Sequence, residues 1–330
     1  MPHSRHTEAA ILRYVNVCGP GLERLGSIDY FLVAETTASH IWVLLMKIVA
    51  SGAAALLLLL AGLAVSPQAA LAAGGESVEA TGEPTSTLEL TYTLYIGGIP
   101  LGKVDLNARV QGDGYKAVSS LETSGVVNTV WRSKIEASSS GKLNGERVGP
   151  SAYDSFSLNG ANPQRREVSL VYDGPVPEVK SNRNFDAIDD NLKKSTLDPV
   201  SAMVSLVTGY ETMQQKPCTQ VAPVFDGRRR YDVTMSFVRK TDVKMDNGLY
   251  SGPVQQCRLK YNQLAGARQR IFEVKALPDI NVWLTSFQST ADPDRHFVVP
   301  LRIFTETDLG LFVAVASRAV LDGRSLAKPK

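Results

Sequence analysis

The sequence contains few of the side chains that most catalytic and metal centres need. Its 330 residues include only 3 cysteines and 4 histidines. Three cysteines are too few for a disulfide-dense mini-protein or a multi-ligand zinc module. A strong charge excess is also absent, because 35 basic residues balance 33 acidic ones and leave a formal net charge of +2. We therefore expect no long-range attraction to nucleic acid.

The overall composition is that of a folded globular chain. Hydrophobic residues make up 44% and charged residues 21%, with 17 prolines and 26 glycines. These proportions exclude collagen-like and wholly disordered chains. The length fits one large domain or two ordinary ones.

Residues 46–72 have the tripartite order of a secretory signal peptide. A positive start at Met46 and Lys47 precedes an apolar run over 48–65, and the small-residue pattern of a cleavage site follows at 70–72. The sequence thus predicts export to the periplasm. The alternative is an uncleaved anchor in the inner membrane through 48–65, since a run of this length could just span a bilayer.

The segments on either side of the predicted signal peptide show no regular pattern. Residues 1–45 precede a start-like methionine, so we interpret them as an unstructured extension from an over-called start codon, with a structured N-terminal extension as the alternative. Residues 73–86 are rich in Gly, Glu, Ser and Thr and predict a flexible leader.

From residue 87 onwards the chain reads as one β-rich domain over 87–322, with a short tail at 323–330. Leu88, Leu90, Tyr92 and Leu94 alternate with polar residues, as in a half-buried strand. Short turn-like segments separate the later strands, which favours an antiparallel meander. Further strands are predicted at 104–110, 115–122, 132–141, 151–158, 166–173, 219–225, 229–239, 254–262, 269–276, 280–288, 297–305 and 311–320.

One helix is predicted near 199–208. Asp198 is a suitable N-cap and Pro199 a suitable first helical residue. Val200, Met203, Val204 and Val207 then recur at helical spacing. We expect this helix to plug the concave side of a single curved antiparallel sheet, an incomplete barrel.

Removal of the front end leaves Cys218 and Cys257 as the remaining cysteines. Two cysteines in an exported chain most simply form one disulfide. A redox-active pair is the alternative, but the C-x-x-C spacing typical of such pairs is absent.

Motifs that resemble catalytic sites are better explained as structure. Residues Gly97 to Lys103 match most of the phosphate-binding loop motif. That motif requires a helix after the loop, but the residues that follow alternate between apolar and polar as in a strand, so we predict a hairpin. Ser139 and Lys142 match a Ser-Lys nucleophile pattern without its partner motifs, so we predict an ordinary loop.

His296 is the one histidine downstream of the signal segment, and it follows the polar run Asp292 to Arg295. An exposed loop histidine is the simpler interpretation, and a metal site with Asp292 and Asp294 is only weakly indicated. We therefore expect no catalytic residues, no metal and no cofactor.

Arg228, Arg229 and Arg230 form the densest basic run, directly after the hairpin signal Asp226-Gly227. One interpretation is a contact for an anion, such as a lipid headgroup or an envelope polymer, or for a partner protein. The other is a solvated or salt-bridged turn.

Five segments stand out together with the two cysteines: Tyr95 to Gly102, Thr123 to Gly125, Leu197 to Ser201, Val224 to Tyr231, and Tyr261 to Gly266. This combination resembles the DUF3108 family of bacterial envelope proteins. The resemblance covers roughly 85–322. It implies a half-barrel akin to the LolA/LolB lipoprotein carriers, with a helical plug, and it implies no established activity.

The leading hypothesis is a non-enzymatic exported protein that binds a lipid, an acyl chain or an envelope protein in its curved sheet. The inward apolar positions could form a ligand cavity or a dry, filled core. A scaffold for envelope integrity that acts through protein contacts is the alternative. A hydrolase using Asp226, Asp292 or Asp294 ranks third. Contact with a membrane is expected only through the signal segment, if it stays uncleaved.

Overall fold

The computed structural model describes residues 83–330 except 131, 161–164, 267–277, 308–309 and 328–330. The predicted extension at 1–45, the predicted signal peptide at 46–72 and the predicted strand at 269–276 lie outside these residues. Within the described part of the chain, no helix has the length and apolar character needed to cross a membrane.

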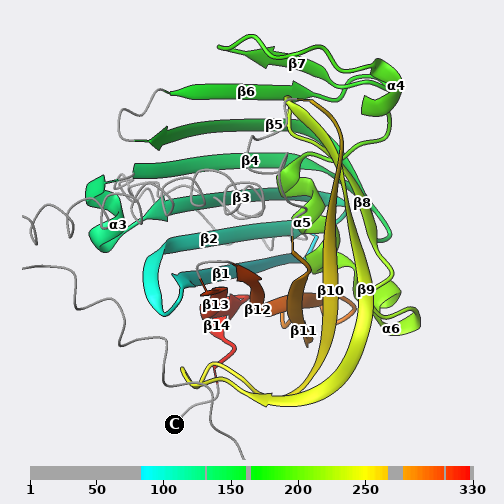
Figure 1. The fold of residues 1–330 in the computed structure, drawn as a ribbon. Coiled ribbons are helices and arrows are strands. Elements are labelled where there is room, and N and C mark those ends of the chain that lie inside the picture. Colours follow the sequence, from blue (N-terminus) through cyan, green and yellow to red (C-terminus); the bar gives the residue numbers. More distant parts are fainter. Residues whose placement is uncertain (1–82, 131, 161–164, 267–277, 308–309, 328–330) are drawn as a thin grey trace, which may run out of the picture. The chain divides into compact units, whose positions relative to one another are not determined.

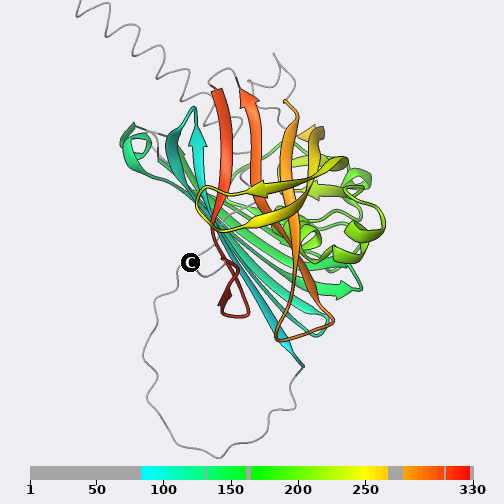
Figure 2. The same cartoon turned by 90° about the horizontal axis from the view of Figure 1, so that it is seen from below.

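One antiparallel sheet makes up most of the fold (Figure 1). Its strands follow the order β7-β6-β5-β4-β3-β2-β1-β13-β12-β11-β10-β9-β8, and β14 is added beside β13. In the described residues β7 and β8 do not pair with each other, so the sheet curls without closing into a barrel, as Figure 2 shows from below. The predicted mainly-β, half-barrel fold class is confirmed. The strands are β1 (Thr85–Ile96), β2 (Ile99–Gln111), β3 (Gly114–Thr123), β4 (Arg132–Asn144), β5 (Arg147–Gly160), β6 (Arg166–Val171), β7 (Glu178–Ser181), β8 (Val221–Phe225), β9 (Arg229–Lys244), β10 (Ser251–Gly266), β11 (Ile280–Gln288), β12 (His296–Thr307), β13 (Gly310–Leu321) and β14 (Arg324–Ser325).

The strands form where apolar and polar residues alternate. Every second residue of β1 is buried. The pairing of Leu88 with Leu321 places the first strand of the chain beside β13, in the middle of the sheet. Gly97 and Gly98 have positive φ angles of 52° and 85° and turn β1 into β2. This is the hairpin that the sequence predicts in place of a phosphate-binding loop.

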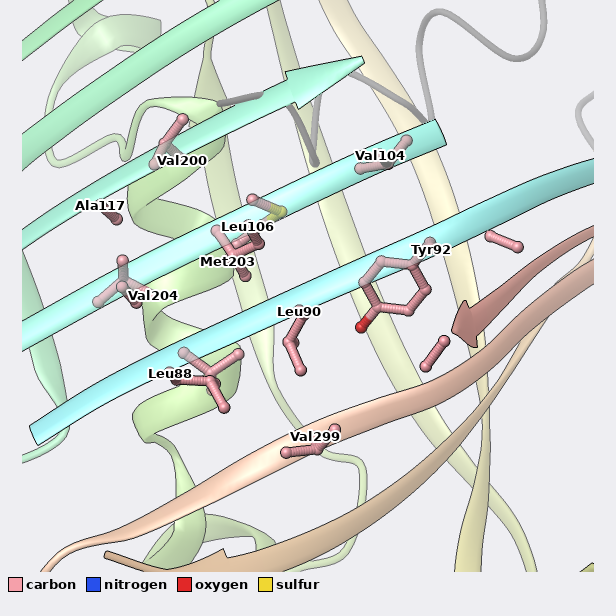
Figure 3. Close-up of a cluster of buried hydrophobic side chains, with 14 of the residues drawn as sticks. Leu88, Leu90, Tyr92, Val104, Leu106, Ala117, Val200, Met203, Val204 and Val299 are labelled. Atoms are coloured by element: carbon pink, nitrogen blue, oxygen red, sulfur yellow. The ribbon is translucent and has the colours of Figure 1, made fainter. Parts of the chain in front are cut away.

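The predicted plug is helix α5 (Pro199–Thr208), and its first turn has the expected cap. Asp198 accepts hydrogen bonds from the backbone N–H groups of Val200 and Ser201, at 2.9 and 2.8 Å. α5 lies in the hollow of the curled sheet (Figure 1). In the close-up of Figure 3, Met203 and Val204 lie among Leu88, Leu90 and Leu106.

Three short helices were not predicted: α3 (Gly125–Val130), α4 (Asp190–Lys193) and α6 (Tyr210–Gln215). Each is too short to show a helical period in the sequence. α6 begins where Glu146, in the turn between β4 and β5, accepts hydrogen bonds from the backbone N–H groups of Glu211 and Thr212. A cap supplied from so far along the chain leaves no local signal.

Two short strands of the structure were not predicted. β7 lies where no strand was predicted, and β14 occupies part of the expected tail at 323–330. Both are short strands added to an existing edge, by pairing with β6 and β13. Residues 73–82 of the expected leader lie outside the described residues, and its last two residues, Thr85 and Ser86, belong to β1.

Candidate functional site

An apolar cavity of about 90 Å³ lies between α5 and strands β8 to β12, with β1 and β2 contributing one residue each. Three lining residues have polar groups: Tyr92, Ser205 and Gln220. The concave face is therefore not completely filled, because the side chains around α5 leave this space. The lining residues are Tyr92, Leu106, Ala202, Met203, Ser205, Leu206, Val207, Gln220, Val221, Ala222, Val233, Met235, Leu259, Val282, Pro300 and Ile303.

The Tyr92 hydroxyl in this lining is already satisfied. It donates a hydrogen bond of 2.7 Å to the backbone carbonyl of Pro300, and burial raises the pKa of the phenol well above its usual value. Tyr92 therefore stays neutral and presents mainly its ring to the cavity. Val221, at the start of β8, is 62% exposed although it also lines the cavity. The wall at this position faces solvent.

A second cavity of about 200 Å³ lies beside α6, against β9 to β12. Its lining mixes apolar and polar side chains. Gln255 is half-buried, and its Oε1 atom is buried without a hydrogen-bond partner among the described residues. The lining residues are Met213, Gln214, Lys240, Pro253, Val254, Gln255, Leu284, Thr285, Ser286 and Val298.

The disulfide belongs to a buried cluster that contributes residues to both cavities. Cys218 and Cys257 are bonded, with their Cα atoms 5.8 Å apart. Both cysteines belong to a buried cluster that also contains Val282, which lines the first cavity, and Met213, which lines the second. The bond ties the segment after α6 to β10, as the two-cysteine count predicts.

The N-terminus of α5 is anchored by a buried polar network that the sequence did not indicate. Asp198 is fully buried and accepts hydrogen bonds from the hydroxyl groups of Ser139, at 2.9 Å, and Ser201. The Tyr115 hydroxyl is 2.8 Å from that of Ser201. Burial raises the pKa of the Asp198 carboxyl to about 6, and the hydrogen bonds oppose this shift. Ser139 thus lies on strand β4, within the strand predicted at 132–141, and anchors the helix, so the interpretation of Ser139 and Lys142 as a loop is wrong.

Asp226 and Gly227 form the turn between β8 and β9. Asp226 accepts hydrogen bonds from the Nε and Nη2 atoms of Arg229, at 2.9 and 2.7 Å, and both side chains are only 4% exposed. A Cβ atom added to Gly227, whose φ is 82°, would lie 2.4 Å from Cγ1 of Val168. The turn therefore packs closely against β6, and its glycine is required for both conformation and space.

The other two arginines of the basic run are also engaged inside the protein. Arg230 is buried and donates to Asp232 at 2.7 Å and to the backbone carbonyl of Leu192 at 2.8 Å. Arg228 is half-buried and lies over the ring of Phe185, at 4.8 Å from its centroid. Burial lowers the pKa of Arg228. The run is thus mainly a buried, salt-bridged turn, because the hairpin closes against α4 and β6.

His296 is the first residue of β12, so the prediction of an exposed loop histidine is wrong. It is half-buried, and its ring stacks on Tyr210 of α6 with centroids 4.2 Å apart. Asp292 forms an ion pair of 3.2 Å with Arg295. In the part of the chain that the structure describes, no three His, Cys, Asp or Glu side chains are grouped so that they could hold a metal ion.

These features define an open antiparallel half-barrel, plugged by a helix, with an apolar cavity under the plug. The chain belongs to the DUF3108 family, described as a protein of unknown function, whose model matches residues 91–317. Comparison with curated proteins finds no match. Among solved structures, the chain is similar to the crystal structure of a beta-barrel-like protein of domain of unknown function DUF1849 from Brucella abortus. That similarity has a TM-score of 0.47 and 10% identity, and it covers 71% of this chain and 97% of the other.

Proposed function

We propose that this protein is an exported, non-enzymatic component of the cell envelope that binds the apolar chain of a lipid or similar molecule under α5. The observation that carries the proposal is the apolar cavity between α5 and strands β8 to β12. Empty space of this kind is rare in a close-packed interior, where side chains normally interdigitate. A cavity with apolar walls offers the surroundings that an alkyl chain prefers to water.

The residue types around the cavity support a pocket that adapts to its ligand. Met203 and Met235 line it, and Met213 lines the neighbouring cavity. Methionine side chains are flexible and polarizable, and they are common at surfaces that accept ligands of varied shape. The disulfide supports the proposed location, because such bonds persist in oxidising compartments such as the periplasm.

The state of the candidate acids favours binding over hydrolysis. Asp226 is held in an ion pair with Arg229, and Asp292 in one with Arg295. A carboxylate already engaged by an arginine is less available to exchange a proton with a substrate, as the acid or base of a hydrolase must.

The proposal is tested by filling the cavity from α5. Ser205→Phe places a large side chain in the lining, whereas Ser205→Ala is the matched control that leaves the cavity open. Protein purified from the periplasm is analysed by native mass spectrometry. We expect wild type and Ser205→Ala to carry a co-purified lipid-sized ligand, and Ser205→Phe to lose most of it. Consistently empty wild-type protein that also binds no added fatty acid would contradict the proposal.

A scaffold that works through protein contacts is the second candidate, because β9 extends beyond its neighbour. β8 pairs only with the first part of β9, up to Thr234, whereas β9 continues to Lys244. Phe237 and Val238 on this extension are 46% and 37% exposed. An uncovered strand edge with apolar side chains can pair with another chain. Cross-linking from position 237 in cells, with no bound lipid, would favour this function.

A further inference from the structure

We propose that the two cavities form one site, which binds a single-chain amphiphile with its tail under α5 and a phosphate- and hydroxyl-bearing head beside α6. This inference rests on the proposed function and specifies the ligand. Neither cavity, at about 90 and about 200 Å³, reaches the roughly 300 Å³ at which small-molecule sites usually begin. Together they come close to that size.

The two linings are contiguous along the sheet. Leu284 of the second cavity is the register partner of Pro300 of the first, across β11 and β12. Val282 of the first cavity lies two positions from Leu284 on the same strand. A ligand that extends from the apolar cavity along β11 is therefore directed toward the second cavity.

The buried cluster that contacts both cavities includes a side chain that can move. Met213 of α6 lines the second cavity and belongs to the buried cluster that also holds Leu259 and Val282 of the first. A methionine changes rotamer at low cost and so can yield to an alkyl chain. The disulfide in the same cluster fixes the backbone on both sides, so that passage requires only side-chain movement.

The second cavity has the groups that a polar head requires. Lys240 and Gln255 are register partners on β9 and β10, and Leu284 pairs with Gln255 on the other side. Lys240 supplies a positive charge at the exposed rim. The buried Oε1 atom of Gln255 accepts no hydrogen bond from the described residues, so a ligand hydroxyl would satisfy it once the side chain turns toward the cavity. A head with an anionic phosphate and hydroxyl donors matches both groups, and a plain alkyl chain matches neither.

The test compares two ligands with the same chain in the full-length protein. Palmitoyl-lysophosphatidylglycerol carries phosphate and hydroxyl groups, and methyl palmitate has neither a charge nor a donor. Their affinities are measured by displacement of an apolar fluorescent dye. We expect Gln255→Leu to weaken binding of the lysophospholipid about 3- to 10-fold. Lys240→Ala should weaken it about two- to fivefold, with the effect lost at high salt. Both variants should bind methyl palmitate as wild type does.

The controls separate this inference from the proposed function. Lys244→Ala removes an exposed lysine from the same strand outside the cavity and should change neither affinity. If both ligands bind but Gln255→Leu and Lys240→Ala leave the lysophospholipid affinity unchanged, the two-part site is wrong and the apolar cavity stands. If neither ligand displaces the dye from wild type, the proposed function itself is wrong. Lys240 is exposed, so its variant keeps the test valid even if Gln255→Leu is unstable.

Discussion

Asp198 and Ser139 join the start of α5 to the middle of β4 through a buried hydrogen bond of 2.9 Å between the Ser139 hydroxyl and the Asp198 carboxylate. The same carboxylate caps the first turn of α5. One side chain therefore both begins the helix and fixes it against the sheet. Because α5 forms one wall of the apolar cavity, this anchor also positions that wall.

Removal of this anchor should be costly. We expect Asp198→Ala to lower the free energy of unfolding by about 2–4 kcal/mol, since it removes a helix cap and leaves buried hydroxyl groups unpaired. Urea denaturation measures the change. Asp189→Ala is the matched control, because Asp189 caps α4 by accepting a hydrogen bond from the Asn191 N–H but is exposed. Its loss should cost no more than about 1 kcal/mol. Equal effects of the two variants would contradict the anchoring role.

The same carboxyl group predicts how stability depends on pH. Burial raises the pKa of Asp198 from 3.8 to about 6 in the folded chain, so the folded state binds this proton more strongly than the unfolded state does. The contribution of Asp198 to stability is then fully present below about pH 4 and is lost as the pH rises through 6. The change is about 3 kcal/mol.

The Asp198→Asn variant isolates this effect, because it cannot titrate. We expect the difference in unfolding free energy between wild type and the variant to shift in favour of the variant between pH 4 and pH 7. The difference between the two proteins is measured because other groups also titrate. Burial would raise the pKa of Asp322, but its hydrogen bonds outweigh this effect and lower the pKa, so its contribution to stability has the opposite pH dependence. Asp322 is present in both proteins, so its contribution cancels in the difference. A difference that stays constant over this range would show that Asp198 is ionised throughout.

The sequence predicts the parts of this fold that depend on local pattern. The alternation in β1, the cap at Asp198 and the helix at 199–208 are read directly from neighbouring residues. The start of α6 could not be predicted, because it depends on Glu146 from a distant turn. The half-buried position of His296 likewise depends on Tyr210, which no local signal places beside it.

The cavity illustrates the same limit. Leu88 and Leu106 occupy equivalent alternating positions on neighbouring strands, yet only Leu106 lines the cavity, while both belong to the buried core. Whether an inward side chain meets another side chain or a void depends on how α5 packs on the sheet, and periodicity does not contain that information. The concave apolar face was therefore predictable, but its empty part was not.

The disulfide should contribute substantially to stability. It joins Cys218 and Cys257, which are separated by 39 positions in the sequence. The chain-entropy model gives about 3–4 kcal/mol for a loop of this length, through restriction of the unfolded chain. We expect replacement of both cysteines by serine to lower the free energy of unfolding by this amount in urea. Wild type in reducing agent should behave like the variant, and the variant should not respond to reducing agent. A reductant-insensitive wild type would show that the bond does not form in the protein.

The buried pair of Asp226 and Arg229 gives the last prediction. Both side chains are 4% exposed, so truncation of one leaves the other as an uncompensated buried charge. We expect Arg229→Ala to lower the free energy of unfolding by about 3–5 kcal/mol.

The matched control for this pair is Arg318→Ala. Arg318 pairs with Glu89 at 2.6 Å on the surface, where the side chains are 54% and 41% exposed. An exposed pair contributes only about 0–1 kcal/mol because water screens it. If the two alanine variants unfold at the same urea concentration, water screens the pair of Asp226 and Arg229 as it screens the surface pair, and the buried-charge argument is wrong.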